Sequence, residues 1–327
     1  LSSEAELAAS QARLLSVERS EFEHWTANKA FPLLPSAESF SVFRSMKKHP
    51  NFGDIGHKFE LRWNRELDAT NDKGLLEFDL EDARGRIPVY GGASFNIWDV
   101  DFSGPWAYVR DRDSFRANME TKFSRLLQHS RSAYVDLRYP EGKVPYDFAR
   151  IAYRWITNQT NTRTTVVCLI PPGTPTVNSA PTIVVRKGGA RGEAFILGVM
   201  SSIPFDWMSR RLVEGNLTFE VLADLPVPLE KIDTPLAERC IEIAGRLGAV
   251  DHRFDEWAAE VGVEVSSVTS QQEKDELIAE LDAVVGHLYD LDADQVTHVF
   301  ESFHRGWEYQ TRLERVLVHY ESWSLKQ

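Results

Sequence analysis

Apolar and polar positions divide the chain into a strand-rich first part and a helical last part. Alternating positions or short apolar runs, which predict β-strands, occur at 59–68, 75–80, 87–90, 95–100, 164–170 and 182–185. Apolar residues at helical spacing occur at 2–27, 40–46, 113–130, 193–208 and along most of the chain after Thr234. The pattern therefore predicts an α+β protein, in which a mixed β-sheet domain is followed by a helical C-terminal region.

Proline pairs mark the places where this organisation changes. Pro32 and Pro35 end the first helical segment, and Pro226 and Pro228 follow the strand-rich part. Proline is excluded from helix interiors, so these positions are natural boundaries. We predict a helical linker over 1–30, a mixed domain over 31–230 and a helical domain over 231–327. Because the chain begins without Met, we expect the linker to lead from a further domain upstream.

One polar stretch, 150–172, interrupts the strand pattern. It begins with Arg150 and Arg154, passes through an uncharged polar run at 157–162, reaches Arg163 and ends in a β-branched run before two prolines. This order predicts a helix or strand, a polar turn and a buried strand. Asn, Gln, Thr and Arg side chains bind base edges and phosphates. A solvated hairpin with an ordinary surface arginine has the same composition.

Charge is distributed unevenly along the chain. The net charge of −12 argues against nucleic-acid binding. However, 138–211 holds ten Lys and Arg against four Asp and Glu, whereas 229–300 holds five against seventeen. A basic segment beside an acidic one is consistent with a DNA-facing module joined to a module that faces elsewhere. Solvated faces of acidic helices give the same count.

The sequence has no recognisable catalytic or metal-binding signature. It contains no Gly-rich nucleotide loop, no GxSxG, no HExxH and no Asn-Pro-Pro-Tyr. Cys168 and Cys240 lie far apart, which favours a reducing cytoplasm over a disulfide framework. No apolar run approaches the ~20 residues that cross a bilayer, so no membrane partner is expected. Binding is therefore favoured over catalysis, with two alternatives: a hydrolase using Asp99, Asp101 and His129, or a protein-interaction scaffold formed by the acidic helices after Thr234.

Six short motifs follow one another in a characteristic order. They are Thr-Asn-Asp at 70–72, Pro-Val-Tyr-Gly at 88–91, the polar stretch at 150–163 with its closing prolines, a Gly/Asn loop at 215–219, Leu-Pro-Val-Pro at 225–228 and an amphipathic segment at 281–291. This order resembles the C-terminal half of large N6-adenine DNA methyltransferases of type IIG restriction–modification and of BREX- or DISARM-type phage defence. The chain departs from that pattern at Gly91 and Ala93, where the family usually has Glu and Lys.

The resemblance implies that 31–230 is a DNA target-recognition domain whose partner is double-stranded DNA. The methyltransferase domain and its S-adenosylmethionine would lie upstream in the same chain, so this chain itself would be no enzyme and would hold no cofactor or metal. In similar type IIG enzymes the loop before the Pro-x-Pro exit carries specificity, which makes Glu214 and Asn216 the strongest base readers.

Two sets of DNA-binding residues follow from these expectations. Arg is the usual partner of guanine, and Asn or Gln that of adenine. Residues expected to contact bases are Asn158, Gln159, Asn161, Thr162, Arg163, Glu214, Asn216 and Thr218. Residues expected to bind phosphates are Arg186, Lys187, Arg191, Arg210 and Arg211.

Overall fold

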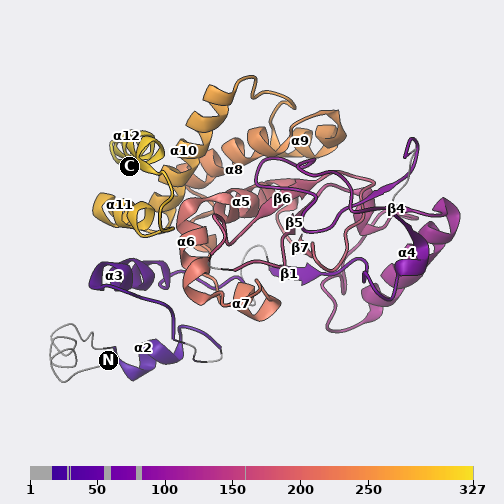
Figure 1. Cartoon of the computed structure of the whole chain (residues 1–327), viewed down its shortest axis with the longest axis horizontal. Coiled ribbons are helices and arrows are strands. Elements are labelled where there is room, and N and C mark those ends of the chain that lie inside the picture. The colour runs from indigo at the N-terminus through magenta and orange to yellow at the C-terminus, as the bar shows by residue number, and fades with distance from the viewer. Residues whose placement is uncertain are drawn as a thin grey trace.

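The computed structural model describes residues 17–27, 29, 31–54, 60–78, 83–158 and 160–326. Three sequence predictions fall partly outside these ranges: the helix over 2–27, of which α2 (Arg19–Glu23) lies within them, and the strands over 59–68 and 75–80. Gln159 is also outside the described residues. In Figure 1 a central sheet separates the C-terminal helices from a smaller sheet and α4 at the opposite end.

The central sheet has four strands in the order β1-β7-β5-β6, each antiparallel to its neighbours. β5 pairs with β6 with Ile151 opposite Leu169, so the first element of 150–172, expected as a helix or a strand, is a strand, and the buried strand expected after the polar turn is present. Asn64 of β1 and Ala152 of β5 both lie opposite Thr182 of β7, so β1 and β5 leave the sheet at the same edge. The strands are β1 (Leu61–Asn64), β5 (Arg150–Tyr153), β6 (Val167–Ile170) and β7 (Thr182–Val185).

A smaller sheet, in the order β2-β4-β3, packs with α4 around a second cluster of buried apolar side chains. Asp111 begins α4 by accepting a hydrogen bond from the backbone N–H of Ser114 at 2.8 Å. The elements are η1 (Lys73–Leu75), β2 (Leu76–Glu77), β3 (Pro88–Val89), β4 (Ala107–Val109), α4 (Arg112–Gln128) and η2 (Pro145–Asp147).

The prediction of a strand over 95–100 is wrong, because this segment forms a turn. Asn96 and Asp99 exchange backbone hydrogen bonds at 2.7 and 3.1 Å, which closes a tight turn between them. Trp98 has a φ of 57°, a left-handed conformation that no extended strand contains. Phe95 and Val100 are nevertheless buried. The apolar pattern in this segment therefore arises from a turn that anchors its side chains in the core.

The apolar segment predicted as one helix over 193–208 forms two. Ser202 has an extended conformation between them, and its hydroxyl caps the second helix by accepting from the N–H of Phe205 at 3.3 Å. Pro204 fits the first turn of that helix, where its missing N–H has no cost. The two helices and the short one that follows are α5 (Gly189–Ser201), α6 (Ile203–Leu212) and α7 (Phe219–Ala223).

The helical C-terminal region is confirmed. Thr234, Ser270 and Asp292 each cap the helix that follows with a side-chain oxygen. None of the helices in the described ranges combines the length and apolar character needed to cross a membrane. The elements, with α3 of the N-terminal part, are α3 (Ala37–Met46), η3 (Leu229–Lys231), α8 (Pro235–Gly248), η4 (His252–Phe254), α9 (Asp255–Val261), α10 (Gln271–Leu288), α11 (Ala293–Glu301) and α12 (Gln310–Ser324).

The largest hydrophobic core runs through both regions that we expected to be separate domains. It includes Phe43 of α3, Leu169 of β6, Leu197 of α5, Ile243 of α8 and Val284 of α10. A continuous core of this kind couples the folding of its parts. The sheet region and the helical region therefore support each other across residue 230.

Gly198 tests this coupling, because it lies where α5 crosses α8. A Cβ at position 198 would lie 2.6 Å from Cys240 Sγ and 3.1 Å from Ala244 Cβ. We expect Gly198→Val to lower the free energy of unfolding by about 1–3 kcal/mol through overpacking. Gly74→Val is the control, since nothing lies within 4 Å of a Cβ there. Equal denaturation midpoints for the two variants would contradict the close α5–α8 contact.

Candidate nucleic-acid interface

Two polar loops that are distant in sequence lie side by side at one edge of the central sheet. An isolated β-bridge joins Ile156 to Asn216. The backbone N–H of Leu217 donates to the carbonyl of Trp155 at 3.0 Å. The structure thus places both segments expected to read bases on one surface. We call residues 156–158, 160–163 and 213–218 the two-loop surface.

The expected base-reading side chains on this surface differ in how far they are already engaged. Asn158 Oδ1 accepts from the N–H groups of Thr160 and Asn161 at 2.8 and 3.1 Å, forming an Asx turn. Asn161 Nδ2 contacts Thr157 Oγ1 at 3.3 Å. Thr218 caps α7 by accepting from the N–H of Val221. These side chains therefore shape the loops as well as line them.

Three other side chains of the two-loop surface stay uncommitted within the described part of the chain. Thr162, Glu214 and Asn216 are exposed, and their side chains make no hydrogen bond or ion pair there. Ile156, which was not among the residues predicted from the sequence, is 66% exposed at the start of the first loop, where it pairs with Asn216. Together they present a hydroxyl, a carboxylate, an amide and an apolar surface to solvent.

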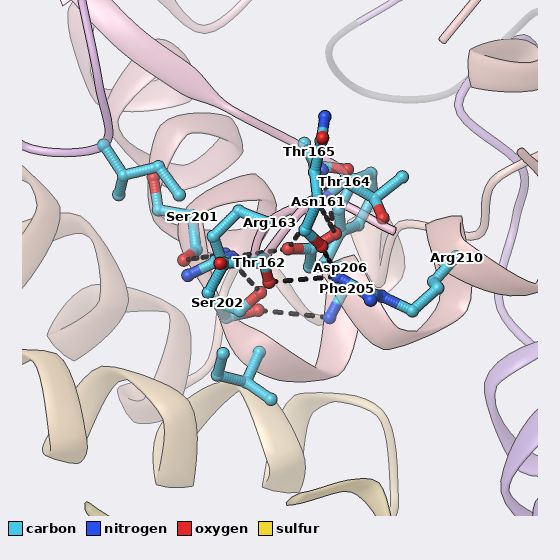
Figure 2. A network of polar contacts seen from close by, with 12 residues as sticks. Asn161, Thr162, Arg163, Thr164, Thr165, Ser201, Ser202, Phe205, Asp206 and Arg210 are labelled. Atoms are coloured by element: carbon cyan, nitrogen blue, oxygen red, sulfur yellow. Dashed lines mark hydrogen bonds and ion pairs between the residues drawn. The ribbon is translucent and has the colours of Figure 1, made fainter. Parts of the chain in front are cut away.

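Arg163 does not belong to this exposed set. Its Nε donates to Asp206 at 2.5 Å and its Nη2 to the carbonyls of Ser201 and Ser202 at 2.8 and 3.2 Å. The Arg163 side chain is 16% exposed and that of Asp206 0%. Figure 2 shows the guanidinium directed at the α5–α6 junction. The hydrogen bonds that we expected Arg163 to offer to DNA are made within the fold.

Arg210 and Arg211 are also directed inward. Arg210 donates to the carbonyl of Asn161 at 2.7 Å and lies 4.4 Å from the ring of Phe303. Arg211 donates to the carbonyl of Ser302 at 3.0 Å. Burial lowers the pKa of both side chains, that of Arg211 to about 10. These two expected phosphate ligands connect α6 to the polar loop and to the end of α11.

The remaining expected phosphate ligands lie elsewhere. Arg186 and Lys187 follow β7, at the sheet edge opposite the two-loop surface. Arg186 donates to the carbonyls of Ala133 and Val135 at 2.9 and 2.7 Å. Lys187 is exposed, with Nζ 3.7 Å from Glu60. Arg191 forms an ion pair with Glu238. The net positive charge of 138–211 therefore does not form one exposed basic face.

Arg65, which was not among the residues predicted from the sequence, borders the two-loop surface. Arg65 directly follows β1, with its guanidinium carbon 4.5 Å from the ring centre of Trp155 and 5.0 Å from that of Phe219. Trp63 stacks on Phe219 at 5.1 Å. The alternation of Trp63 and Arg65 places both on one face of the strand. The two-residue spacing in the sequence predicts that Trp63 and Arg65 share a face, but it does not predict their contacts with Trp155 and Phe219.

A large hollow on the described surface is separate from the two-loop surface. It has a volume of about 740 Å³ and is lined by β7, the segment 137–149, the start of α5 and α9. Glu193 lies in its wall and accepts from Trp257 Nε1 at 2.8 Å. Burial, with a smaller contribution from Glu260, raises the pKa of Glu193 to about 7.

The residues of the alternative hydrolase do not assemble in the described part of the chain. Asp101 accepts hydrogen bonds from the Tyr90 hydroxyl and from Arg253, which use it structurally. His129 accepts from the backbone N–H of Arg131 at 3.2 Å, and no contact there joins it to Asp99 or Asp101. A search of the same residues for three or more His, Cys, Asp or Glu side chains placed to hold a metal ion finds none.

Comparisons with known proteins are sparse. No protein-family model matches the chain, and no curated protein matches it. Among solved structures, the chain is similar to MmeI, a type IIL restriction-modification enzyme solved in complex with DNA. The match covers 78% of this chain and 36% of that one, with 13% sequence identity and a TM-score of 0.36. The chain thus spans about a third of the length of that enzyme.

Replacing Arg163 separates a structural role from a DNA contact. We expect Arg163→Ala to lower the free energy of unfolding by about 3–5 kcal/mol, because Asp206 would keep a buried charge without its partner. The double variant Arg163→Ala/Asp206→Asn should lose less than the sum of the single losses. Arg138→Ala, at an exposed arginine, is the control, and chemical denaturation is the measurement. A loss no larger than that of Arg138→Ala would show that the ion pair does not hold the loop.

The raised pKa of Glu193 predicts a pH-dependent stability. The folded protein holds this proton up to pH ~7, whereas an unfolded Glu releases it near 4.3. Protonated Glu193 therefore stabilises the fold fully below pH ~4, and this stabilisation is lost as pH rises to 7. Over that range we expect the free energy of unfolding of wild type to fall by about 3 kcal/mol relative to that of Glu193→Gln. Denaturation series at several pH values measure it, with Glu256→Gln on α9 as the control. Parallel profiles for wild type and Glu193→Gln would exclude the shift.

Proposed function

We propose that this chain recognises a specific sequence in duplex DNA, as the target-recognition part of an N6-adenine DNA methyltransferase. One observation carries the proposal. Two polar loops, at 156–163 and 213–218, belong to motifs that resemble this family, and they lie against each other with exposed side chains. Direct reading of a base pair needs such a set of donors and acceptors on one surface.

The side chains that remain uncommitted have the chemistry for this task. Asn216 can donate to and accept from adenine, and Glu214 can accept from the amino group of cytosine. The Thr162 hydroxyl can donate or accept a hydrogen bond, and Ile156 offers an apolar contact to a thymine methyl group. Asn158 and Asn161 would place these groups by fixing the turn. Glu214 and Asn216 remain our choice for specificity.

The loops are also held rigidly. Hydrogen bonds from the N–H groups of Thr164 and Thr165 to Asp206 hold the end of the loop at 156–163, and Arg210 holds its Asn161 carbonyl. The Leu217 N–H, bonded to the Trp155 carbonyl just after β5, holds the loop at 213–218. Rigid presentation reduces the entropy lost on binding. In this proposal methyl transfer and S-adenosylmethionine belong to a domain upstream, and this chain selects the target.

The acidic helices have a structural explanation, which makes the scaffold alternative less favoured. Glu280 of α10 pairs with Arg239 at 2.6 Å, Glu273 with Arg246 at 2.5 Å and Asp282 with Arg312 at 2.5 Å. Much of the negative charge on α10 therefore joins helices to one another instead of facing a partner.

The proposal predicts salt-dependent binding to duplex DNA. Fluorescence anisotropy with a randomised duplex should give a log–log salt slope of several units, because bound phosphates release counterions. Selection of bound sequences should enrich one motif. Glu214→Ala and Asn216→Ala should change the enriched bases, whereas Glu321→Ala on α12 should not. Absence of salt-dependent binding would contradict the function. An unchanged motif in both loop variants would contradict these base assignments alone.

A further inference from the structure

The two-loop surface lacks a cation of its own. Arg163 is its one basic side chain among the described residues, and that guanidinium is bound to Asp206 and backbone carbonyls. Glu214 adds a negative charge. A duplex approaching these loops therefore needs positive charge from the neighbouring surface, because phosphate contacts supply most of the affinity of DNA-binding proteins.

Arg65 lies where that charge is needed. β1 and β5 leave the sheet at the same edge, so Arg65 after β1 lies beside Trp155 after β5. The carbonyl oxygen of Trp155 also accepts a hydrogen bond from the N–H of Leu217 in the second loop. Phe219, which begins α7 directly after that loop, supplies the other ring under the guanidinium. The cation is thus attached to the frame of both loops.

The charge of Arg65 is not neutralised by an ion pair. Arg65 is exposed, and no carboxylate of the described residues lies within ion-pair distance of it. Two acids are near. Backbone N–H groups of Asn71 and Thr70, and more weakly the charge of Arg65, lower the pKa of Asp68. Burial raises the pKa of Tyr153, and on that pKa the charges of Arg65 and Glu220 act in opposite directions, Arg65 lowering it and Glu220 raising it. Both acids are solvated neighbours and neither is a partner.

Stacking prepares the guanidinium for an anion. The rings of Trp155 and Phe219 contact its π-face, so the in-plane N–H donors stay available at the edge. A fixed planar fork with no acceptor atom fits two oxygens of one phosphate. The hollow of about 310 Å³ beside Arg65 is also lined by Arg125, which is exposed. Arg125 is thus a second exposed cation beside Arg65, although Glu66, Asp68 and Asp72 line the same hollow.

We propose that Arg65, held against Trp155 and Phe219, binds a backbone phosphate of the DNA whose bases the two-loop surface reads. This inference rests on the proposed function. It adds a residue outside both expected site sets, and it replaces Arg210 and Arg211 as the cation beside the loops.

The test compares three variants in the anisotropy titration. Arg65→Ala should weaken binding about tenfold, the loss of one charge-assisted contact. It should also reduce the salt slope by about one unit and leave the selected sequence unchanged. Arg62→Ala is the matched control, because it removes the same charge from the same strand but from a side chain paired with Glu60 at 3.2 Å. Arg65→Lys should keep the slope and bind about threefold more weakly, since an ammonium lacks the stacked fork.

Each outcome has a separate meaning. Wild type without salt-dependent binding would overturn the proposed function and this inference with it. Wild type that binds, with Arg65→Ala no weaker than Arg62→Ala, would overturn this inference alone. A changed selected sequence at an unchanged slope would show that Arg65 reads a base and would also overturn it. Thermal unfolding of the Arg65 variants should match that of wild type within a few degrees, because the side chain of Arg65 is exposed and exposed side chains contribute little to stability.

Discussion

The buried carboxylate of Asp206 is the interaction on which the candidate interface depends. It is inaccessible to solvent and accepts hydrogen bonds from Arg163 and from the N–H groups of Thr164 and Thr165. A charge in this position is tolerable only with a cation and several donors around it. All of these donors come from the hairpin that follows β5. The polar loop must therefore return to α6, and its exposed tip is fixed as a consequence.

A second buried aspartate fixes the same helix from its other side. Asp282 of α10 accepts from the N–H of Ile203 at 2.8 Å and from Arg312 of α12 at 2.7 Å. α6 is thus connected by buried charges to the hairpin and to the C-terminal helices. Its last residue precedes the second polar loop at 213–218. The helical region, although rich in acidic residues, therefore helps to position the surface that we assign to DNA.

The sequence predicted local elements well and tertiary partners poorly. The strand at 182–185 was predicted with the bounds that the structure has, because a short β-branched run is bounded there by turn-forming residues. The helical character of the chain after Thr234 was also predicted, from apolar residues at helical spacing. The segment 95–100 has a strand-like pattern too, but the hydrogen bonds between Asn96 and Asp99 close it into a turn. Periodicity records which side chains are buried, and a turn can bury alternate residues as a strand does.

The interface shows the same division between local and tertiary information. Both polar loops could be found from composition and motif order, and their adjacency could not. The fate of Arg163 is decided by Asp206, which lies 43 positions later. The net charge of 138–211 does not distinguish exposed arginines from buried ones, and a folded chain uses arginine inside wherever carbonyls and carboxylates must be satisfied. An exposed arginine held by aromatic rings, as Arg65 is, keeps its hydrogen-bonding capacity for a partner. Where a polyanion can bind therefore depends on whether each cation is exposed or already bonded within the fold, rather than on the net charge of a segment.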